Sequence, residues 1–301
     1  SGWEPVLALA EQYRALDLKP DLIIASDMLD LGKFLALTRP VTAEIPTVLY
    51  FHENQLTYPL PAGVERDLGY GMKNITSGLA ATRILFNSRF HRSEFLGAVA
   101  DLLEALPDEV PVGLMEELER KSAVLPVGCD LRRFDCHREP ALQEAALGRW
   151  GDVARGPLLL WNQRWEYDKA PGDFFAALRV LSAEGIPFRL AMAGPNQGTP
   201  TNDFLRAKAE LAPHIVHWGR VDREEDYAHL LWAADVVAST ALHEFFGIAV
   251  VEAVYCGCRP VLPWRLSYPE IIPSEKHEVV LYREEGLVPA LMRALEHPRA
   301  W

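Results

Sequence analysis

Two cations, Arg164 and Lys169, stand five positions apart in the stretch WNQRWEYDKAPGDFF, residues 161–175. The apolar run at 157–161 predicts a buried strand before them, and the apolar spacing at 172–184 predicts a helix after them. Both cations therefore belong to a turn at the end of a strand, which is the edge where parallel sheets bind ligands. Two positive charges at that edge indicate an anionic ligand, and the alternative is a pair of solvated surface cations.

Two carboxylates, Glu244 and Glu252, lie eight positions apart in the stretch HEFFGIAVVEAVYCGCRPVLP, residues 243–263. Residues 246–256 are apolar at helical spacing, which places Glu244 on the loop before a helix and Glu252 about two turns into it. The start of that helix would expose the backbone amides of Phe245, Phe246 and Gly247. Such a helix N-terminus binds anions, and the carboxylates could hold the hydroxyl groups of a sugar nucleotide. Alternatively, they only favour the helix dipole.

Polar residues also follow the strands predicted in the first half of the chain. His52 comes directly after the apolar run 47–51, and an imidazole with an ordinary pKa of about 6.5 can donate or accept a proton at neutral pH. The other polar residues at such strand ends are Ser26, Asp27, Glu53, Asn54, Gln55, Asn87 and Ser88. For these residues, loop hydrogen bonding or helix capping is an equally good explanation.

Short apolar runs alternate with amphipathic stretches along the chain, which predicts an α/β fold with parallel sheets. The predicted strands are 21–26, 47–51, 83–87, 123–127, 157–161, 188–194, 214–219, 235–240 and 259–263. The predicted helices include 3–17, 69–81, 89–105, 172–184, 224–233 and 246–256. The stretch 128–156 has no strand-like run and separates the two sets of strands, so we expect two domains, residues 1–130 and 131–301. Because helix 3–17 has no strand before it, we expect the first domain to be incomplete at its N-terminus.

The composition narrows the classes of function. With 42 acids against 30 bases the net charge is −12, so the field of the whole molecule does not favour nucleic acid, although a local basic patch is compatible with it. No segment reaches the roughly 20 apolar residues of a membrane span, and we expect no signal peptide. The four cysteines form no CxxC pair, and His137, His277 and His297 lack the spacing of metal ligands. We therefore expect reduced thiols, a cytoplasmic protein and no metal site.

Taken together, the two stretches resemble the retaining glycosyltransferases of family 4. The resemblance consists of Arg-x4-Lys after a strand, followed about 75 residues later by Glu-x7-Glu with FFG inside it. The segment LPVGCDLRRFD at 125–135 also looks like the P-x-G-x-D-x-x-x-F linker of that family. The resemblance implies the GT-B architecture, in which two Rossmann-like domains face a cleft.

The same resemblance implies roles for individual residues. Arg164 and Lys169 would hold the donor diphosphate and stabilise the charge on the leaving group, which makes a metal unnecessary. Glu244 would face the transferred sugar, Glu252 would bind the ribose, and His52 would lie near the reacting oxygens. The predicted catalytic residues are thus His52, Arg164, Lys169 and Glu244. The predicted donor-binding residues are Gly194, Asn196, Gly219, Arg220, Val221, Phe245, Phe246, Gly247 and Glu252.

The first half narrows the resemblance to the tRNA-queuosine α-mannosyltransferases and their bacterial relatives. Three phrases carry it: ASDMLDLGKFLALTRP at 25–40, LYFHENQLTYPL at 49–60 and FNSRFHRSEFL at 86–96. The opening strand and glycine-rich loop of that family are absent, which fits the helical start. The resemblance implies transfer of mannose from GDP-mannose to queuosine in a tRNA, with retention and without a cofactor.

A tRNA acceptor would need a basic face, and several cations fall near the strand ends of the first domain. They are Arg66, Lys73, Arg83, Arg89 and Arg92. A solvated helix face explains them equally well. Two other functions stay open: a family 4 enzyme with a lipid or small-glycoside acceptor, and a nucleotide-sugar-binding module without catalysis.

Overall fold

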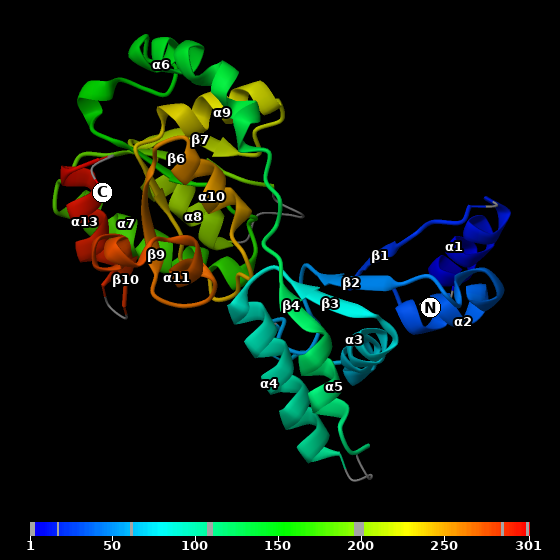
Figure 1. The fold of residues 1–301 in the computed structure, drawn as a ribbon. Helices are drawn as coiled ribbons and strands as arrows, with labels where there is room; N and C mark the ends of the chain where they lie inside the picture. Colours follow the sequence, from blue (N-terminus) through cyan, green and yellow to red (C-terminus); the bar gives the residue numbers. More distant parts are fainter. Residues whose placement is uncertain are drawn as a thin grey trace. The chain divides into compact units, whose positions relative to one another are not determined.

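The computed structural model describes residues 4–16, 18–60, 63–106, 111–195, 202–283, 286–298 and 301. The chain divides into two compact units, residues 1–127 and 128–301, and each unit builds its own sheet (Figure 1). All strand pairs in both sheets are parallel, which confirms the predicted α/β class. Among the described helices, none combines the length and apolar character that crossing a membrane requires.

The first unit holds a four-stranded sheet whose spatial order follows the sequence. Its strands are β1 (Ile23–Ser26), β2 (Thr47–Phe51), β3 (Arg83–Phe86) and β4 (Ser122–Val124). Its helices are α1 (Glu4–Ala15), α2 (Leu31–Thr42), α3 (Leu68–Ala80), α4 (Arg89–Ala105) and α5 (Leu114–Lys121). Phe51 and Phe86 stack with their ring centroids 4.9 Å apart in the core. The carboxyl ends of β2 and β3 are thereby fixed beside each other.

The second unit holds a six-stranded sheet in the order β10-β9-β8-β5-β6-β7. Its strands are β5 (Leu158–Trp161), β6 (Arg189–Ala193), β7 (Ile215–Gly219), β8 (Val236–Ala238), β9 (Arg259–Pro263) and β10 (Leu281–Tyr282). This is the strand order of a Rossmann sheet, in which the winding direction reverses between the first and fourth strands. Here those strands are β5 and β8. Ligands of such sheets bind beyond the carboxyl ends of the strands at this reversal.

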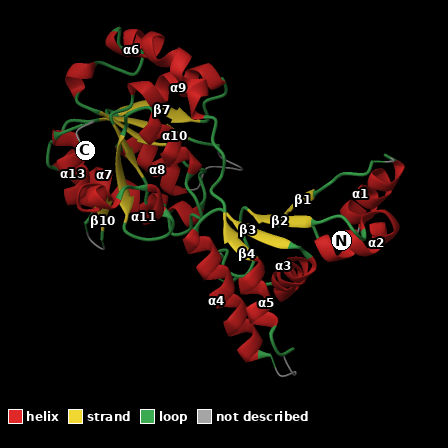
Figure 2. Ribbon diagram, viewed as in Figure 1, coloured by secondary structure: helices red, strands yellow, loops and turns green. Residues whose placement is uncertain are grey.

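Helices cover both faces of the second sheet (Figure 2). They are α6 (Arg138–Ala146), α7 (Pro171–Ala183), α8 (Asn202–Glu210), α9 (Glu224–Ala233), α10 (Ile248–Tyr255), α11 (Tyr268–Ile271), α12 (His277–Val280) and α13 (Leu287–Glu296). Every residue of β5 and β6 is buried. Side chains of each strand alternate between two cores: Leu159 and Leu190 belong to one, and Leu160 and Ala191 to the other. Burial on both faces explains why parallel strands appear in the sequence as continuous apolar runs.

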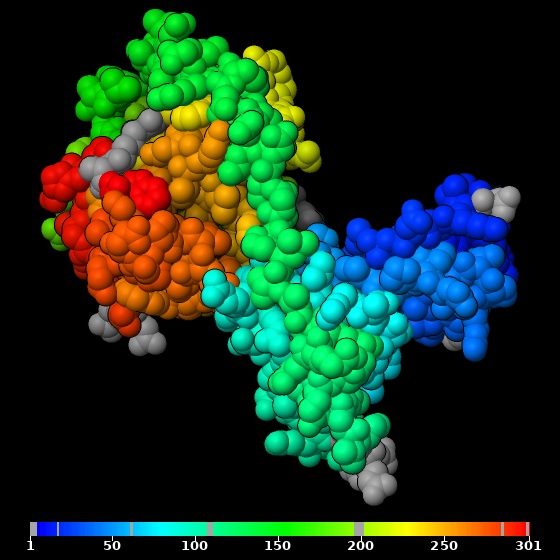
Figure 3. Space-filling view, viewed as in Figure 1, coloured from blue at the N-terminus to red at the C-terminus, as the bar shows by residue number. Residues whose placement is uncertain are grey.

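Each of the nine predicted strands is present, whereas the two-residue strand β10 was not predicted. The stretch 128–156 lacks a strand, as expected, but it contains the 3-10 helix η1 (Leu131–His137) and helix α6. Figure 3 shows these green residues at the surface of the second unit, next to the yellow residues of α9. This stretch therefore packs onto the second unit as part of its fold.

Candidate functional site

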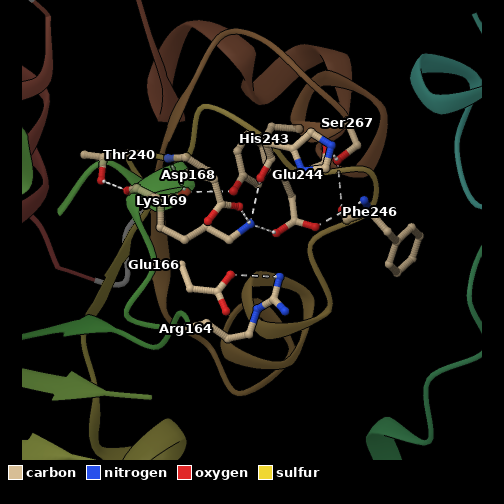
Figure 4. Close-up of polar contacts among 12 residues, drawn as sticks. Arg164, Glu166, Asp168, Lys169, Thr240, His243, Glu244, Phe246 and Ser267 are labelled. Carbon is tan, nitrogen blue, oxygen red and sulfur yellow. Dashed lines mark hydrogen bonds and ion pairs between the residues drawn. The ribbon is translucent and has the colours of Figure 1, made fainter. Parts of the chain in front are cut away.

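The turn that carries Arg164 and Lys169 is hydrogen-bonded to the loop that carries Glu244 (Figure 4). The Thr240 hydroxyl donates to the backbone carbonyl of Lys169 at 2.7 Å, and the Leu242 amide donates to the carbonyl of Asp168 at 2.8 Å. The first loop follows β5 and the second follows β8, so both arise at the strand-order reversal. The fold thus joins the two stretches that the sequence singles out.

Lys169 lies at the centre of this region and is almost fully buried. Its ammonium donates to the carbonyl of His243 at 2.6 Å, and it forms ion pairs with Asp168 at 3.1 Å and Glu244 at 3.4 Å. Lys169 is 5% exposed and Asp168 is 0% exposed. A buried charge is stable only when it is paired and hydrogen-bonded, so this geometry holds a cation at the strand ends.

A strained backbone places that lysine. Residues Tyr167–Lys169 form the 3-10 turn η3, and Ala170 follows with a left-handed φ of 44°. A left-handed conformation costs an alanine about 1–2 kcal/mol, and the contacts of Lys169 offset it. Pro171 then takes the first position of α7, as its fixed φ favours. The turn therefore directs Lys169 toward the β8 loop.

Arg164 differs from Lys169 in being at the surface. Its side chain is 44% exposed, and its guanidinium lies 3.4 Å from a carboxylate oxygen of Glu166. The cations Arg164 and Lys169 face the carboxylates of Glu166, Asp168 and Glu244, so the formal charges sum to 2 − 3 = −1. An anion at this place would consequently depend on directed donors and backbone amides rather than on net positive charge.

Those amides belong to the start of α10, which begins at Ile248 rather than at the predicted residue 246. Gly247 takes a left-handed φ of 96° before the helix, and this is the reason for the later start. Glu252 therefore lies one turn into the helix, and the predicted two turns were wrong. The Phe246 amide contacts the Glu244 carboxylate at 3.4 Å, and the Ser267 hydroxyl fixes the carbonyl of Phe246 at 3.0 Å.

Glu252 is held by two partners that the sequence analysis missed. Its carboxylate accepts a bond from the Arg133 guanidinium at 2.7 Å and one from the Tyr227 hydroxyl at 3.0 Å, and Glu252 is 8% exposed. Burial, followed by the charge of Glu252, raises the pKa of the Tyr227 hydroxyl well above its ordinary value. The tyrosine therefore stays protonated and donates. The two donors fix the orientation of the Glu252 carboxylate.

A pocket of about 410 Å³ opens beside Tyr227. It is lined by Asn162, Ala193, Gly194, Pro195, Arg220, Val221 and Tyr227. The structure thus brings the predicted residues Gly194, Arg220 and Val221 together with Asn162, which follows β5 directly. Asn162 donates to the Tyr227 hydroxyl at 3.1 Å, and the Gly194 amide donates to the carbonyl of Gly219 at 3.2 Å. The predicted residue Asn196 lies outside the described residues.

Glycine is required at the rim of this pocket. A Cβ atom at position 194 would lie 1.9 Å from the backbone carbonyl oxygen of Gln163. That carbonyl belongs to the loop after β5, so the absence of a side chain lets β6 and β5 end in close contact. Gly219 has a φ of 124°, which L residues rarely adopt.

In the first unit, polar side chains from three neighbouring strand ends meet around His52. The amide of His52 donates to the Asp27 carboxylate at 2.9 Å, and the Asn87 side chain donates to the carbonyl of His52 at 2.9 Å. Asp27 is buried, and burial raises the pKa of its carboxyl above the ordinary value. The His52 backbone is thereby held in place, while its exposed ring packs against Tyr50 with centroids 4.8 Å apart.

The loop after His52 is held by hydrogen bonds within the loop and from Arg66. The Asn54 carboxamide oxygen accepts the amides of Leu56 and Thr57 at 3.0 Å each, and Asn54 is fully buried. Arg66 donates to the carbonyl of Gln55 at 2.6 Å and to that of Tyr58 at 2.9 Å. Asn54 and Arg66 therefore shape the loop, and Arg66 is not simply a solvated cation.

The expected gathering of five cations near the strand ends was wrong for Arg83. This residue is the first of β3, so it lies at the amino edge of the parallel sheet, opposite to the edge that carries Asn87. It donates to the carbonyl of Arg120 at the end of α5. Lys73 lies on α3 and donates to the carbonyl of Met28, beyond the carboxyl end of β1.

Comparison with known proteins agrees with the division of the chain into two units. Residues 4–129 match the family model "tRNA-queuosine alpha-mannosyltransferase N-terminal", and residues 150–300, half of the chain, match "Glycosyl transferases group 1". The tRNA-queuosine alpha-mannosyltransferase of Drosophila melanogaster is 37% identical over 255 residues, which cover 84% of this chain and 66% of the fly protein. A GDP-mannose-dependent alpha-(1-6)-phosphatidylinositol dimannoside mannosyltransferase of Mycobacterium tuberculosis is 28% identical over 187 residues, 61% of this chain and 47% of that protein.

The chain thus spans between about half and two thirds of the length of these two relatives. Among solved structures, a UDP-forming trehalose-phosphate synthase from Burkholderia xenovorans matches with a TM-score of 0.70 at 17% identity, covering 99% of this chain and 71% of that one. A sucrose-phosphate synthase from Thermosynechococcus elongatus matches with a TM-score of 0.65 at 16% identity, covering 98% and 70%. These likenesses confirm the GT-B fold. The chain belongs to the glycosyl transferases group 1, and its first unit carries the N-terminal domain of the tRNA-queuosine alpha-mannosyltransferase type.

Proposed function

We propose that this chain belongs to a retaining glycosyltransferase that moves mannose from GDP-mannose to queuosine in a tRNA. The observation that carries the donor half is the meeting of Lys169 and Glu244 at the strand-order reversal of the second unit. Support for the acceptor comes from the first unit, which matches the queuosine-type N-terminal domain. GDP-mannose is favoured because the mycobacterial relative is named for that donor. A tRNA acceptor would also suit the cytoplasmic location expected from the cysteines.

In this proposal the donor extends from the Tyr227 pocket to Lys169. The base enters the pocket beside Gly194 and Val221, and the Glu252 carboxylate, oriented by its two donors, accepts the ribose hydroxyls. The diphosphate takes the Arg164 guanidinium and the amides at the start of α10. Lys169 turns from its 3.4 Å contact with Glu244, the longest of its three, toward a phosphate oxygen. Glu244 is then available for the sugar hydroxyls.

The proposed chemistry needs charge stabilisation rather than a protein nucleophile. The bond from the sugar carbon to the diphosphate oxygen breaks, and the acceptor hydroxyl oxygen bonds to the same face, which retains the configuration. The proton of that hydroxyl passes to the departing diphosphate. Arg164 and Lys169 stabilise the charge that develops on the leaving GDP. They do so without a metal in this proposal. His52 remains a predicted catalytic residue of the first unit.

The direct test incubates the protein with GDP-mannose and queuosine-containing tRNA, digests the RNA to nucleosides and measures a hexose on queuosine by mass spectrometry. A tRNA that lacks queuosine is the matched control. Transfer to a phosphatidylinositol mannoside with unmodified tRNA would replace the acceptor and support the lipid alternative, which the mycobacterial relative suggests. Tight GDP-mannose binding without transfer or hydrolysis would instead indicate a binding module.

A further inference from the structure

A cluster of three potential metal ligands lies outside the donor site, between η1 and α9. The ligand atoms of His137, Glu225 and His229 all lie within 4.8 Å of one another. Glu225 and His229 are four positions apart on α9, so they share one face of that helix. His137 is the last residue of η1 and precedes α6, which packs against α9 (Figure 1). The cluster therefore joins two segments that are distant in the sequence.

His229 supplies a second, independent observation. It is 3% exposed, and its Nδ1 contacts the Glu144 carboxylate at 2.8 Å. The same Nδ1 lies 3.1 Å from a guanidinium nitrogen of Arg149, which can only donate. In the tautomer that donates its Nδ1 proton to Glu144, the lone pair is on Nε2. Within the described residues, Nε2 is buried and has no hydrogen-bond partner. A carboxylate that fixes one nitrogen of a histidine while the other carries a free lone pair is the usual arrangement behind a metal-binding histidine.

The local charge is also compatible with a cation. Arg149 contacts Glu144 and Asp226, and Arg223 contacts Glu225. These five groups, two cations and three carboxylates, sum to 2 − 3 = −1. Glu144 and Asp226 already neutralise Arg149, while Glu225 is exposed and can exchange its arginine partner for a metal.

We propose that His137, Glu225 and His229 bind a zinc ion that clamps η1 and α6 to α9. Two imidazoles and one carboxylate are a common zinc set, and a water would complete a tetrahedron. Zinc ligand bonds of about 2.0–2.2 Å would draw the three ligand atoms closer together than they lie here. The side chains of Glu225 and His137 are not buried and can rotate to allow this. The clamp would also hold Arg133, on η1, against Glu252 in the donor site.

The test measures zinc binding to the whole chain after removal of metals with a chelator and exchange into metal-free buffer. Isothermal titration with zinc chloride should show one equivalent bound, and the melting temperature should rise as zinc saturates. The variants His137→Ala and Glu225→Gln should each weaken zinc binding at least tenfold. His297→Ala, outside the cluster, is the matched control and should bind as the wild type does. Magnesium chloride should not compete, because imidazole ligands favour zinc.

Each outcome decides the proposal. Unchanged affinity in both cluster variants, or a stoichiometry well below one, would overturn it. An equal loss in His297→Ala would show non-specific binding and would also overturn it. Glu144→Gln gives a finer check, because it keeps the three ligands and removes the charge of the carboxylate that contacts both His229 and Arg149. It should weaken zinc binding, while circular dichroism confirms that each metal-free variant is folded.

Discussion

The ammonium of Lys169 lies 3.4 Å from a carboxylate oxygen of Glu244, although the two residues are 75 positions apart in the sequence. The contact exists because β5 and β8 are neighbours at the point where the sheet reverses its winding. Each residue stands on the loop beyond one of these strands. The candidate donor site is therefore a direct consequence of strand order.

The exposed position of Arg164 makes it the cleaner test of diphosphate binding. Arg164→Ala should weaken GDP binding by about 10- to 100-fold, since a charge-assisted hydrogen bond contributes about 1.5–3 kcal/mol. The free energy of unfolding of this variant should differ from that of the wild type by no more than about 0.5 kcal/mol, as for other surface substitutions. Calorimetric titration with GDP and urea unfolding measure the two effects. Arg179→Ala is the control: it lies in the second half of α7, its side chain is 32% exposed, and it pairs with Glu210. A GDP affinity equal to that of the wild type would mean that Arg164 is a solvated surface cation and does not bind the diphosphate.

Lys169→Ala should harm both folding and binding, because Lys169 compensates the fully buried Asp168. Removing one partner of a buried ion pair costs about 3–5 kcal/mol. Urea unfolding should show a loss of this size. The double variant Asp168→Asn with Lys169→Met should recover part of it, since no buried charge is left unpaired. If Lys169→Ala were as stable as wild type, the ion pair would have no structural role.

The sequence predicted these positions but not their environments. Arg164 and Lys169 are recognisable because each lies in a turn between an apolar run and a helix, and local pattern suffices for that. Lys169 is buried and Arg164 exposed only because the β8 loop covers one of them, which depends on a contact 75 positions away. Tyr227 and Arg133 were missed for the same reason. Asn162 was predictable from the sequence, because it is a polar residue directly after β5, only two positions before Arg164.

His243 should make the stability depend on pH. Its burial, and then the nearby Lys169 charge, lower its pKa from 6.5 to about 4. Between these values the unfolded chain binds a proton that the folded chain does not, so stability is fully present above pH 6.5 and falls as the pH drops toward 4. At about 1.4 kcal/mol for each pH unit the loss is at most about 3 kcal/mol, and partial exposure reduces it.

The measurement is urea unfolding of wild type and His243→Asn at several pH values from 7.5 to 4.5. The difference in unfolding free energy between the two proteins should shrink or reverse in acid, because only the wild type carries the depressed imidazole. Comparing the difference cancels the contribution of other groups such as Asp27. Parallel pH curves for the two proteins would contradict the prediction.

Gly194→Ala should damage the pocket and the fold together. The new Cβ would meet the Gln163 carbonyl oxygen at 1.9 Å, so the loops after β5 and β6 must move apart. We expect a loss of about 1–3 kcal/mol, as for overpacking, and weaker GDP binding. Gly97→Ala is the control: it lies on the exposed side of α4 with nothing within 4 Å of its Cβ, and should stabilise by about 0.5–1 kcal/mol. Equal effects in the two variants would exclude the clash.

Helix boundaries were less predictable than strands. The start of α10 was placed too early because the apolar pattern of FFGIAVV continues through Gly247, and only its left-handed φ of 96° separates the two parts. Helix α6 was missed because its polar residues give little periodicity, while its packing on α9 stabilises it. The cluster of His137, Glu225 and His229 was invisible for a related reason, since two of its members share α9 and the third joins them only through that packing.

The donor chemistry should survive chelation even if the zinc clamp is removed. Arg164 and Lys169 are expected to neutralise the leaving diphosphate directly, and both lie on the β5 loop, whereas the clamp residues lie on η1 and α9. With EDTA, kcat at a temperature well below unfolding should stay within about twofold of the untreated value, while the melting temperature falls if zinc had been bound. The assay follows GDP release from GDP-mannose.

Loss of kcat that magnesium or manganese restores would mean that the reaction uses a metal at the diphosphate. Loss that only zinc restores, and that Glu225→Gln reproduces, would mean that the clamp positions Arg133 and Glu252 for catalysis.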